Sequence, residues 1–391
     1  MQSCLTPTFR DANQSTLRTG WSARPLPSTE IHVTDPSSRI AVICAHNPKN
    51  SGMYCVDNGA RLYFSSRKIP HDLIVTQGRH QIGDLRYVPV ATPRQLKKYE
   101  TVVYWGDFLT NPMWGLRDYT HRHSPTGSTS TTAEWVDLYL RLKSINPGTR
   151  IVVAGGCALG SADPQIPAEI ADAYRHLLAS ADELILRDPG SVQTVQQVQP
   201  QAHPQLGFDC ASLWMPPPRQ KLSPAYFAYA FHRTLPKADA DRVVKEAERL
   251  TGMKGIEIGW LKNRWPSRLF HLRLTAQLAL IARARFCLTD IYHLSVCSMA
   301  RNTPAICVAG VDDVIESTLN ETKKHLLFEL LNIPNHLITW RDHWETALQH
   351  AIESALLTSP TTPPWKANFD TSRQRLIQQL DDIFLTPARS G

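Results

Sequence analysis

The segment 286–308 has the pattern of one strand–helix–strand unit. An apolar run is followed by Asp290 and His293, a short helical stretch, an Asn-Thr-Pro breaker at 302–304 and a second apolar run. Parallel strands require such a crossover, so the pattern predicts a parallel sheet. In open sheets of this kind ligands bind beyond the carboxyl ends of the strands, where Asp290 and His293 would lie.

The same alternation extends over most of the 391 residues. Strands are expected at residues 39–45, 73–76, 101–105, 150–154, 183–187, 226–231, 255–261, 286–289 and 336–340. Helices are expected at residues 133–145, 168–180, 238–250, 271–285, 322–331, 344–356 and 372–384. Alternation of this kind predicts a doubly wound parallel sheet.

Two proline-rich stretches divide this pattern. Residues 216–218 are three consecutive prolines, which favour an extended connector, and 359–364 is a second linker. The division predicts an N-terminal arm (1–37) and an N-terminal Rossmann-like acceptor domain (38–215). It also predicts a C-terminal Rossmann-like donor domain (222–358), followed by a C-terminal crossover helix with its tail (365–391). The predicted fold class is therefore α/β, with two doubly wound domains facing a cleft, as in GT-B transferases.

Composition excludes several classes of protein. With 42% hydrophobic and 20% charged residues the chain is neither disordered nor fibrous. No apolar run reaches the roughly 18 residues that a membrane span needs. The eight cysteines include no Cys-x-x-Cys pair, so neither a zinc site nor a disulfide framework is expected. Free thiols of this kind predict a cytoplasmic location. The net charge of +7 favours acidic partners: phosphorylated substrates, anionic lipid surfaces contacted peripherally, or nucleic acid.

A polar strand end stands out at residues 183–191. The apolar strand ends in Arg187 and Asp188, and Ser191 is placed to cap the next helix. An arginine at such an edge can bind a phosphate or carboxylate bidentately. The alternative is a local Arg187–Asp188 ion pair that only fixes the turn.

These motifs together resemble the polysaccharide pyruvyl transferase family. The resemblance rests on the order of short motifs between residues 39 and 340: Asn50-Ser51-Gly52, Trp105-Gly106-Asp107, Gly155-Gly156, Arg187-Asp188-x-x-Ser191, Gly207-Phe208-Asp209, Asp290-x-x-His293 with Asn302-Thr303-Pro304, and Lys323-Lys324-His325 leading to Pro334. Two departures matter. The family's Arg-Leu-His reads Ile291-Tyr292-His293 here, and its Asn-x-Gly-Asp turn ends in Met53.

The resemblance implies transfer of a pyruvyl group from phosphoenolpyruvate to a saccharide, with no cofactor and no metal. It implies that His293 acts as acid or base, since an imidazole titrates near neutrality. The alternative is that His293 only caps its helix or bonds in a buried corner. The expected catalytic groups are His293, Arg187 and Asp290. The expected donor or phosphate ligands are Arg187, Tyr292, Arg233, Lys262, Arg264 and Lys324. The expected acceptor ligands are Asn50, Ser51, Gly52, Gly106 and Asp107.

Two other functions use the same architecture. Residues 260–268 interleave cations with tryptophans, and such a loop could hold a nucleotide sugar, with Trp265 stacked on the base. A GT-B glycosyltransferase would need no metal, in line with the absence of an Asp-x-Asp motif; its acceptor would be a carbohydrate, a metabolite or, less favoured, a nucleic acid. The third hypothesis is a binding module without catalysis on this fold.

Overall fold

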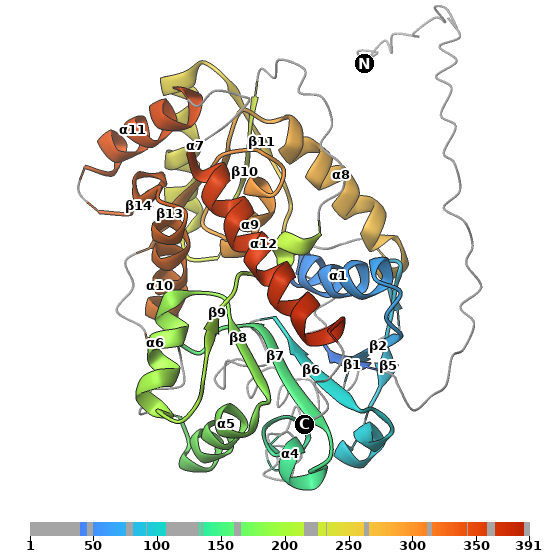
Figure 1. The fold of residues 1–391 in the computed structure, drawn as a ribbon. Helices are drawn as coiled ribbons and strands as arrows, with labels where there is room; N and C mark the ends of the chain where they lie inside the picture. Colours follow the sequence, from blue (N-terminus) through green and yellow to red (C-terminus); the bar gives the residue numbers. More distant parts are fainter. Residues whose placement is uncertain are drawn as a thin grey trace, which may run out of the picture. The chain divides into compact units, whose positions relative to one another are not determined.

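Two parallel sheets organise the chain in the computed structural model (Figure 1). The structure describes residues 40–44, 50–75, 81–90, 92–106, 133, 136–159, 166–214, 226–231, 233–261, 266–310, 315–341, 343–357 and 364–386. The predicted N-terminal arm and the proline connector at 216–218 lie outside these ranges.

The first sheet has seven strands in the order β5-β2-β1-β6-β7-β8-β9, all paired in parallel. They are β1 (Ile40–Ile43), β2 (His71–Val75), β5 (Val88–Pro89), β6 (Thr101–Trp105), β7 (Arg150–Gly156), β8 (Glu183–Leu186) and β9 (Gln205–Leu206). β1 is buried along its whole length, as expected of a central parallel strand covered on both faces. The strand order reverses between β1 and β6, so helices leave in opposite directions there and open a ligand position. A short antiparallel pair, β3 (Gln81–Ile82) and β4 (Leu85–Arg86), lies apart from the sheet.

The second sheet has five parallel strands in the order β11-β10-β12-β13-β14. They are β10 (Tyr226–Ala230), β11 (Lys254–Glu257), β12 (Cys287–Thr289), β13 (Ala305–Ala309) and β14 (Leu337–Thr339). Its order reverses between β10 and β12, which gives it a ligand position of its own. We call the parts carrying the two sheets the first and second lobes.

The helices are α1 (Ser51–Ser66), α4 (Leu142–Ile145), α5 (Ala168–Ser180), α6 (Pro189–Val198), α7 (Lys237–Thr251), α8 (Phe270–Arg283), α9 (Tyr292–Met299), α10 (Ile315–Leu330), α11 (Trp344–Leu357) and α12 (Pro364–Phe384). The predicted doubly wound α/β fold class is confirmed. Three helix predictions were inaccurate: residues 133–145 contain a π-helical turn at Val136–Leu140 before the short α4, α10 begins seven residues before the predicted 322, and α12 begins eight residues before the predicted 372. The helix α1 was not predicted.

The C-terminal helix α12 contacts both lobes, as expected of the predicted crossover helix (Figure 1). Near its start, Asn368 donates a hydrogen bond to the backbone oxygen of Leu331 in the second lobe, at 3.1 Å. Near its end, Asp381 accepts a hydrogen bond from Tyr63 of α1 at 2.8 Å and pairs with Arg67 in the first lobe. The helix therefore spans both lobes, and residues 35–391 form one unit by their contacts.

Truncating Trp365 in the first turn of α12 should destabilise the protein strongly, because its side chain is fully buried. We expect Trp365→Ala to lower the free energy of unfolding in urea by about 3–5 kcal/mol. Leu357→Ala is the control: Leu357 is 84% exposed, so a change within about 0.5 kcal/mol is expected. Equal effects of the two variants would show that α12 does not hold the lobes.

Candidate functional site

The first turns of two helices, one from each lobe, meet beside the points where the strand orders reverse. α1 follows β1 in the first lobe, and α9 follows β12 in the second. Asn50 caps α1, accepting hydrogen bonds from the backbone nitrogens of Gly52 at 2.9 Å and Met53 at 3.4 Å. A Cβ on Gly52 would lie 2.6 Å from the Cβ of His293, so only glycine permits this approach. Gly52 and His293, both predicted site residues, are therefore brought together.

Arg187 lies directly after β8 with its side chain fully buried. Its Nη1 is 3.3 Å from Oδ2 of Asp209, and its Nε is 3.5 Å from Oδ2 of Asp188. Its guanidinium carbon lies over the ring of Tyr292 from the second lobe, 4.3 Å from the centroid. A buried cation needs such compensation, because its removal from water is costly. The Arg187–Asp188 ion pair considered from the sequence is thus present, but a second carboxylate, Asp209, shares the cation.

Asp188 also begins α6. Its Oδ1 accepts a hydrogen bond from the backbone nitrogen of Ser191 at 2.7 Å, and its Oδ2 accepts one from the Ser191 hydroxyl at 3.0 Å. The expectation that Ser191 caps this helix was therefore wrong: the N-cap is Asp188. Ser191 Oγ in turn accepts from the backbone nitrogen of Ala158 at 3.0 Å. One turn thus fixes both Asp188 and, through it, the guanidinium of Arg187.

His293 reaches the same carboxylate as Arg187. Its Nε2 lies 3.6 Å from Oδ2 of Asp209, an ion-pair distance that is longer than a hydrogen bond. The imidazole keeps 12% of its side-chain surface exposed, whereas the Asp209 side chain keeps 3%. Oδ1 of Asp209 accepts a hydrogen bond from the backbone nitrogen of Ala211 at 2.8 Å, which orients the carboxylate. Arg187 and His293, 106 residues apart in sequence, thus meet at one oxygen atom.

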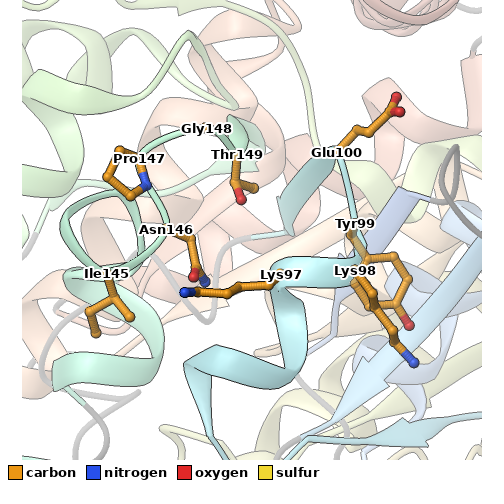
Figure 2. A pocket seen from close by; sticks show the side chains of 9 residues that line it. All are labelled: Lys97, Lys98, Tyr99, Glu100, Ile145, Asn146, Pro147, Gly148 and Thr149. Atoms are coloured by element: carbon orange, nitrogen blue, oxygen red, sulfur yellow. The ribbon is translucent and has the colours of Figure 1, made fainter.

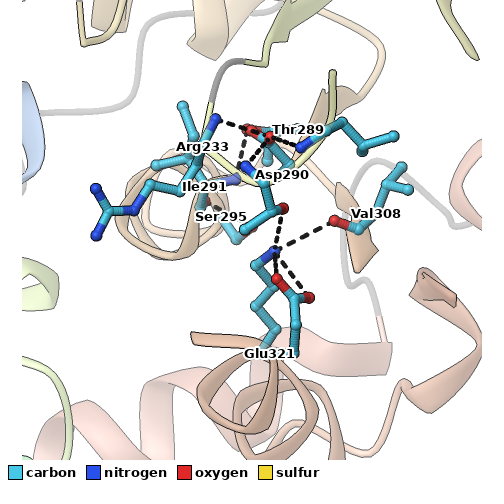
Figure 3. A network of polar contacts seen from close by, with 10 residues as sticks. Arg233, Thr289, Asp290, Ile291, Ser295, Val308 and Glu321 are labelled. Carbon is cyan, nitrogen blue, oxygen red and sulfur yellow. Dashed lines mark hydrogen bonds and ion pairs between the residues drawn. The ribbon is translucent and has the colours of Figure 1, made fainter. Parts of the chain in front are cut away.

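Asp290 is completely buried in the second lobe, where it holds the loop after β10 (Figure 3). Its Oδ2 accepts hydrogen bonds from the backbone nitrogens of Arg233 at 2.9 Å, Thr234 at 2.8 Å and Leu235 at 3.0 Å. These bonds give the predicted catalytic carboxylate a role in shaping the loop. The Arg233 side chain is exposed and points away from this network (Figure 3).

Lys324, predicted to bind the donor phosphate, is buried in α10 and is engaged with protein groups. Its Nζ donates to both carboxylate oxygens of Glu321 at 2.8 and 3.0 Å, to Oγ1 of Thr234 at 3.2 Å and to the backbone oxygen of Val308 at 3.3 Å (Figure 3). Burial raises the pKa of Glu321, and the Lys324 ammonium opposes that rise. The ammonium is thus engaged by acceptors of the second lobe, and its predicted role in binding the donor phosphate stays a prediction.

The remaining predicted residues fall into two groups. Ser51 of α1 donates to Oε1 of Gln277 in α8 at 3.4 Å, so it connects the lobes. Gly106 follows β6 with a φ of +83°, and a Cβ there would lie 2.6 Å from Cγ1 of Val56, so close packing requires glycine. The predicted residues Asp107, Lys262 and Arg264 lie outside the described ranges.

Two residues of this site were absent from the predicted set. Asp209 lies in the Gly207-Phe208-Asp209 motif noted in the sequence, and Asp188 had been considered only as a partner of Arg187. Both carboxylates lie just beyond the carboxyl end of a parallel strand, Asp188 two residues after β8 and Asp209 three residues after β9, where such sheets gather polar groups.

One pocket in the described part of the chain lies away from this cluster. It has a volume of about 720 Å³ and is lined by Lys97, Lys98, Tyr99, Glu100, Ile145, Asn146, Pro147, Gly148 and Thr149 (Figure 2). These residues directly precede β6 and β7, so the pocket is at the amino ends of the parallel strands. The polar cluster around Asp209 lies at the carboxyl ends, where ligands of such sheets bind. We therefore take the cluster, and not the pocket, as the candidate site.

Within the described ranges, no three His, Cys, Asp or Glu side chains gather so that they could hold a metal ion. Among the helices that the structure describes, none has the length and apolar character of a bilayer-crossing segment.

No family model and no curated protein matches the chain. Among solved structures it is similar to the S. aureus MnaA–UDP co-structure, at 12% identity over 90% of this chain and 99% of that chain, with a TM-score of 0.48. It is also similar to Methanocaldococcus jannaschii UDP-GlcNAc 2-epimerase in complex with UDP-GlcNAc and UDP, at 14% identity over 86% of this chain and 99% of that chain, with a TM-score of 0.45. A third similar structure is Arabidopsis thaliana UGT89C1 complexed with UDP-L-rhamnose, at 12% identity over 89% of this chain and 96% of that chain, with a TM-score of 0.43. These TM-scores are low, so the fold assignment rests on the strand orders. The likeness to polysaccharide pyruvyl transferases stays a resemblance of short motifs.

Adding a methyl group at Gly52 should force the two helices apart. We expect Gly52→Ala to lower the free energy of unfolding by about 1–3 kcal/mol, because the new Cβ overlaps Cβ, Cγ and Nδ1 of His293. His293→Gly removes those atoms, so the loss caused by Gly52→Ala should be smaller in that background, by about 0.5–3 kcal/mol.

The control is Gly148→Ala, since a Cβ there meets no heavy atom within 4 Å. Its free energy of unfolding should be unchanged or raised by up to about 1 kcal/mol. Strictly additive effects of Gly52→Ala and His293→Gly in urea unfolding would contradict the close contact.

Proposed function

We propose that the protein is a GT-B-type glycosyltransferase that takes a nucleoside-diphosphate sugar as donor. The observation that supports this most is the N-terminus of α9, which lies beside the reversal point of the second sheet and whose N-cap residue, Ile291, makes no side-chain cap hydrogen bond. A helix N-terminus presents backbone N–H groups and a partial positive charge, and so favours an anion such as a diphosphate.

The charges near α9 favour a diphosphate over phosphoenolpyruvate. Phosphoenolpyruvate carries both a phosphate and a carboxylate on three carbons, so it calls for several cations. Arg187 is already compensated by Asp188 and Asp209, and Lys324 by Glu321. A nucleotide sugar needs only its diphosphate neutralised, and the rest of the molecule binds through neutral groups.

His293 would act as general base in this reaction. It lies in the first turn of α9, within reach of the anion position and of the α1 turn in the other lobe. It would take the proton of the acceptor hydroxyl as that oxygen attacks the anomeric carbon. The diphosphate would leave with both electrons of the glycosidic bond, and the N-terminus of α9 would stabilise its charge. The acceptor expected is a saccharide.

Pyruvyl transfer from phosphoenolpyruvate is the second candidate, favoured by one specific observation. Arg187, Asp209 and His293 belong to three separate motifs of the resemblance, and their side chains converge. Such convergence supports a shared role for the three motifs, although it does not identify the donor.

Thermal unfolding with a ligand panel separates the two candidates. A nucleoside diphosphate or its sugar conjugate should raise the melting temperature, because a ligand at 100 times its Kd stabilises the native state by about 2.7 kcal/mol. Phosphoenolpyruvate at equal concentration should leave it unchanged. Stabilisation by phosphoenolpyruvate alone would reverse the ranking, and no response to any member would refute both.

Replacement of His293 tests the base. With the donor found by the panel, His293→Ala should lower kcat by about 10²–10⁴-fold, while the donor still raises the melting temperature. His350→Ala, on the exposed face of α11, is the matched control and should retain full turnover. A kcat within a few-fold of wild type for His293→Ala would exclude this residue as the base.

A further inference from the structure

We propose that a pocket at the edge of the second sheet binds a neutral saccharide against two tryptophans, Trp340 and Trp344. The inference rests on the proposed function for the kind of ligand, a saccharide acceptor, and deepens it by giving that acceptor a second contact beyond the reacting unit. Its test requires neither the donor nor the reaction to be known.

The pocket lies beyond the carboxyl end of β14, the edge strand of the second sheet. Its volume is about 720 Å³, and it is lined by one residue of α7 and by the segment that joins β14 to α11: Arg242, Trp340, Arg341, His343, Trp344 and Glu345. α7 and α11 pack against each other on one face of this sheet (Figure 1). Pockets for small ligands usually measure about 300–1,000 Å³ and combine aromatic walls with a few polar groups, and this pocket has both.

The two indoles form one apolar wall. Their ring centroids are 4.5 Å apart, with the planes tilted by 36°. The guanidinium carbon of Arg242 lies 5.4 Å from the ring centroid of Trp340 and 5.6 Å from that of Trp344. Trp344 is only 8% exposed and anchors the pair in the core of the second lobe, whereas Trp340 is half-buried. The negative face of an indole attracts the C–H bonds that a pyranose ring presents on its apolar side, so this wall suits a sugar.

Polar groups beside the wall can both donate to sugar hydroxyls and accept from them. Within the described ranges, the exposed Arg341 guanidinium and the two indole N–H groups donate to no protein group. Glu345 supplies acceptors, since its Oε1 lies 3.9 Å from Nη2 of Arg242, beyond hydrogen-bond distance. A hydroxyl donates one hydrogen bond and can accept two, so a saccharide uses both kinds of group.

The charges around the pocket favour a neutral ligand over a polyanion. Nη1 of Arg242 is 3.7 Å from Oδ1 of Asp239, and its Nη2 faces Glu345. In the sequence, Asp342 adds a further negative charge next to Arg341, although it lies outside the described ranges. A nucleic acid binds chiefly by neutralising its phosphates with unpaired cations, and here the guanidinium charges are matched by carboxylates. A neutral saccharide needs these groups only as donors and acceptors.

The pocket shares an edge of the sheet with the candidate site. The backbone nitrogen of Trp340 donates to the backbone oxygen of Ala309 at 2.8 Å, which continues the pairing of β13 with β14 beyond Thr339. In the strand order, β13 lies between β14 and β12, the strand that leads to α9, and two strand spacings amount to about 10 Å. A saccharide of a few linked units is long enough to touch both the pocket and the N-terminus of α9.

The test is NMR of the full-length chain carrying tryptophan labelled with ¹⁵N at the indole nitrogen. The signals of Trp340 and Trp344 are assigned by their loss in Trp340→Phe and Trp344→Phe. The neutral probes are maltohexaose, cellohexaose, chitohexaose and mannohexaose, and the acidic comparisons are hexagalacturonate and a short single-stranded DNA. We expect at least one neutral probe, titrated into the millimolar range, to shift both signals saturably, while the signal of Trp365, fully buried in α12, stays in place.

Arg341→Ala separates a contact with the ligand from a contact that holds the fold. Because this guanidinium is exposed, the variant should fold as wild type does, and the Kd of the responding saccharide should rise by about fivefold to tenfold. Arg94→Ala is the matched control, since Arg94 is an exposed arginine of the 3₁₀ segment Pro93–Lys98 in the first lobe, and its Kd should be unchanged. Trp340→Ala should raise the Kd by more than about tenfold. If that variant does not fold, Arg341→Ala decides.

Three results would overturn the proposal: no neutral probe shifts the Trp340 and Trp344 signals, only an acidic probe shifts them, or Arg341→Ala and Arg94→Ala have equal effects. The proposed function can fail separately. If no nucleotide ligand is found while a neutral saccharide shifts the Trp340 signal, the glycosyltransferase assignment is refuted and the saccharide site stands. If nucleoside diphosphates bind and the Trp340 signal does not respond to any saccharide, the reverse holds.

Discussion

A buried cation shared by two carboxylates is the interaction on which the rest of the candidate site depends. Moving a lone guanidinium from water to a protein interior has an idealised cost of order 20 kcal/mol, so Arg187 requires Asp188 and Asp209. Each carboxylate also begins a helical segment: Asp188 caps α6, and Asp209 caps the 3₁₀ turn Cys210–Leu213. Arg187 therefore fixes two chain turns at the edge of the first sheet. Removing it would leave two buried carboxylates without this cation.

The same edge is where the lobes touch, and it permits few residue types. Gly52 is required because a side chain would overlap His293, and Ser51 beside it bonds to Gln277 across the interface. Tyr292 covers the Arg187 guanidinium from the opposite side. Apolar side chains complete this interface: the ring centroids of Tyr54 in α1 and Phe270 in α8 lie 5.0 Å apart, and buried residues of α1, α8 and α9 belong to one hydrophobic cluster.

Much of the fold could be predicted from sequence, because buried parallel strands read as apolar runs. β6 and α5 have the bounds expected from residues 101–105 and 168–180. The strand orders could not be predicted, since a neighbour such as β6 beside β1 is chosen by tertiary packing. α1 was missed because residues 51–60 are all buried, yet they include two glycines, Asp57 and Asn58. A helix buried all round has no polar face, so it lacks the amphipathic period by which helices are recognised.

The site shows a similar limit. The sequence identified charged residues at strand ends, but it could not separate those that join the lobes from those that serve one lobe. Asp290 and Lys324 are bonded to backbone and side-chain groups of the second lobe alone, where they hold a loop. Asp209 and His293 belong to different lobes, and their distance depends on how the lobes meet. A polar pair inside one lobe is positioned by the fold of that lobe alone. A pair across the interface also requires the packing of one lobe against the other, and this physical difference distinguishes the candidate site from the buried networks around it.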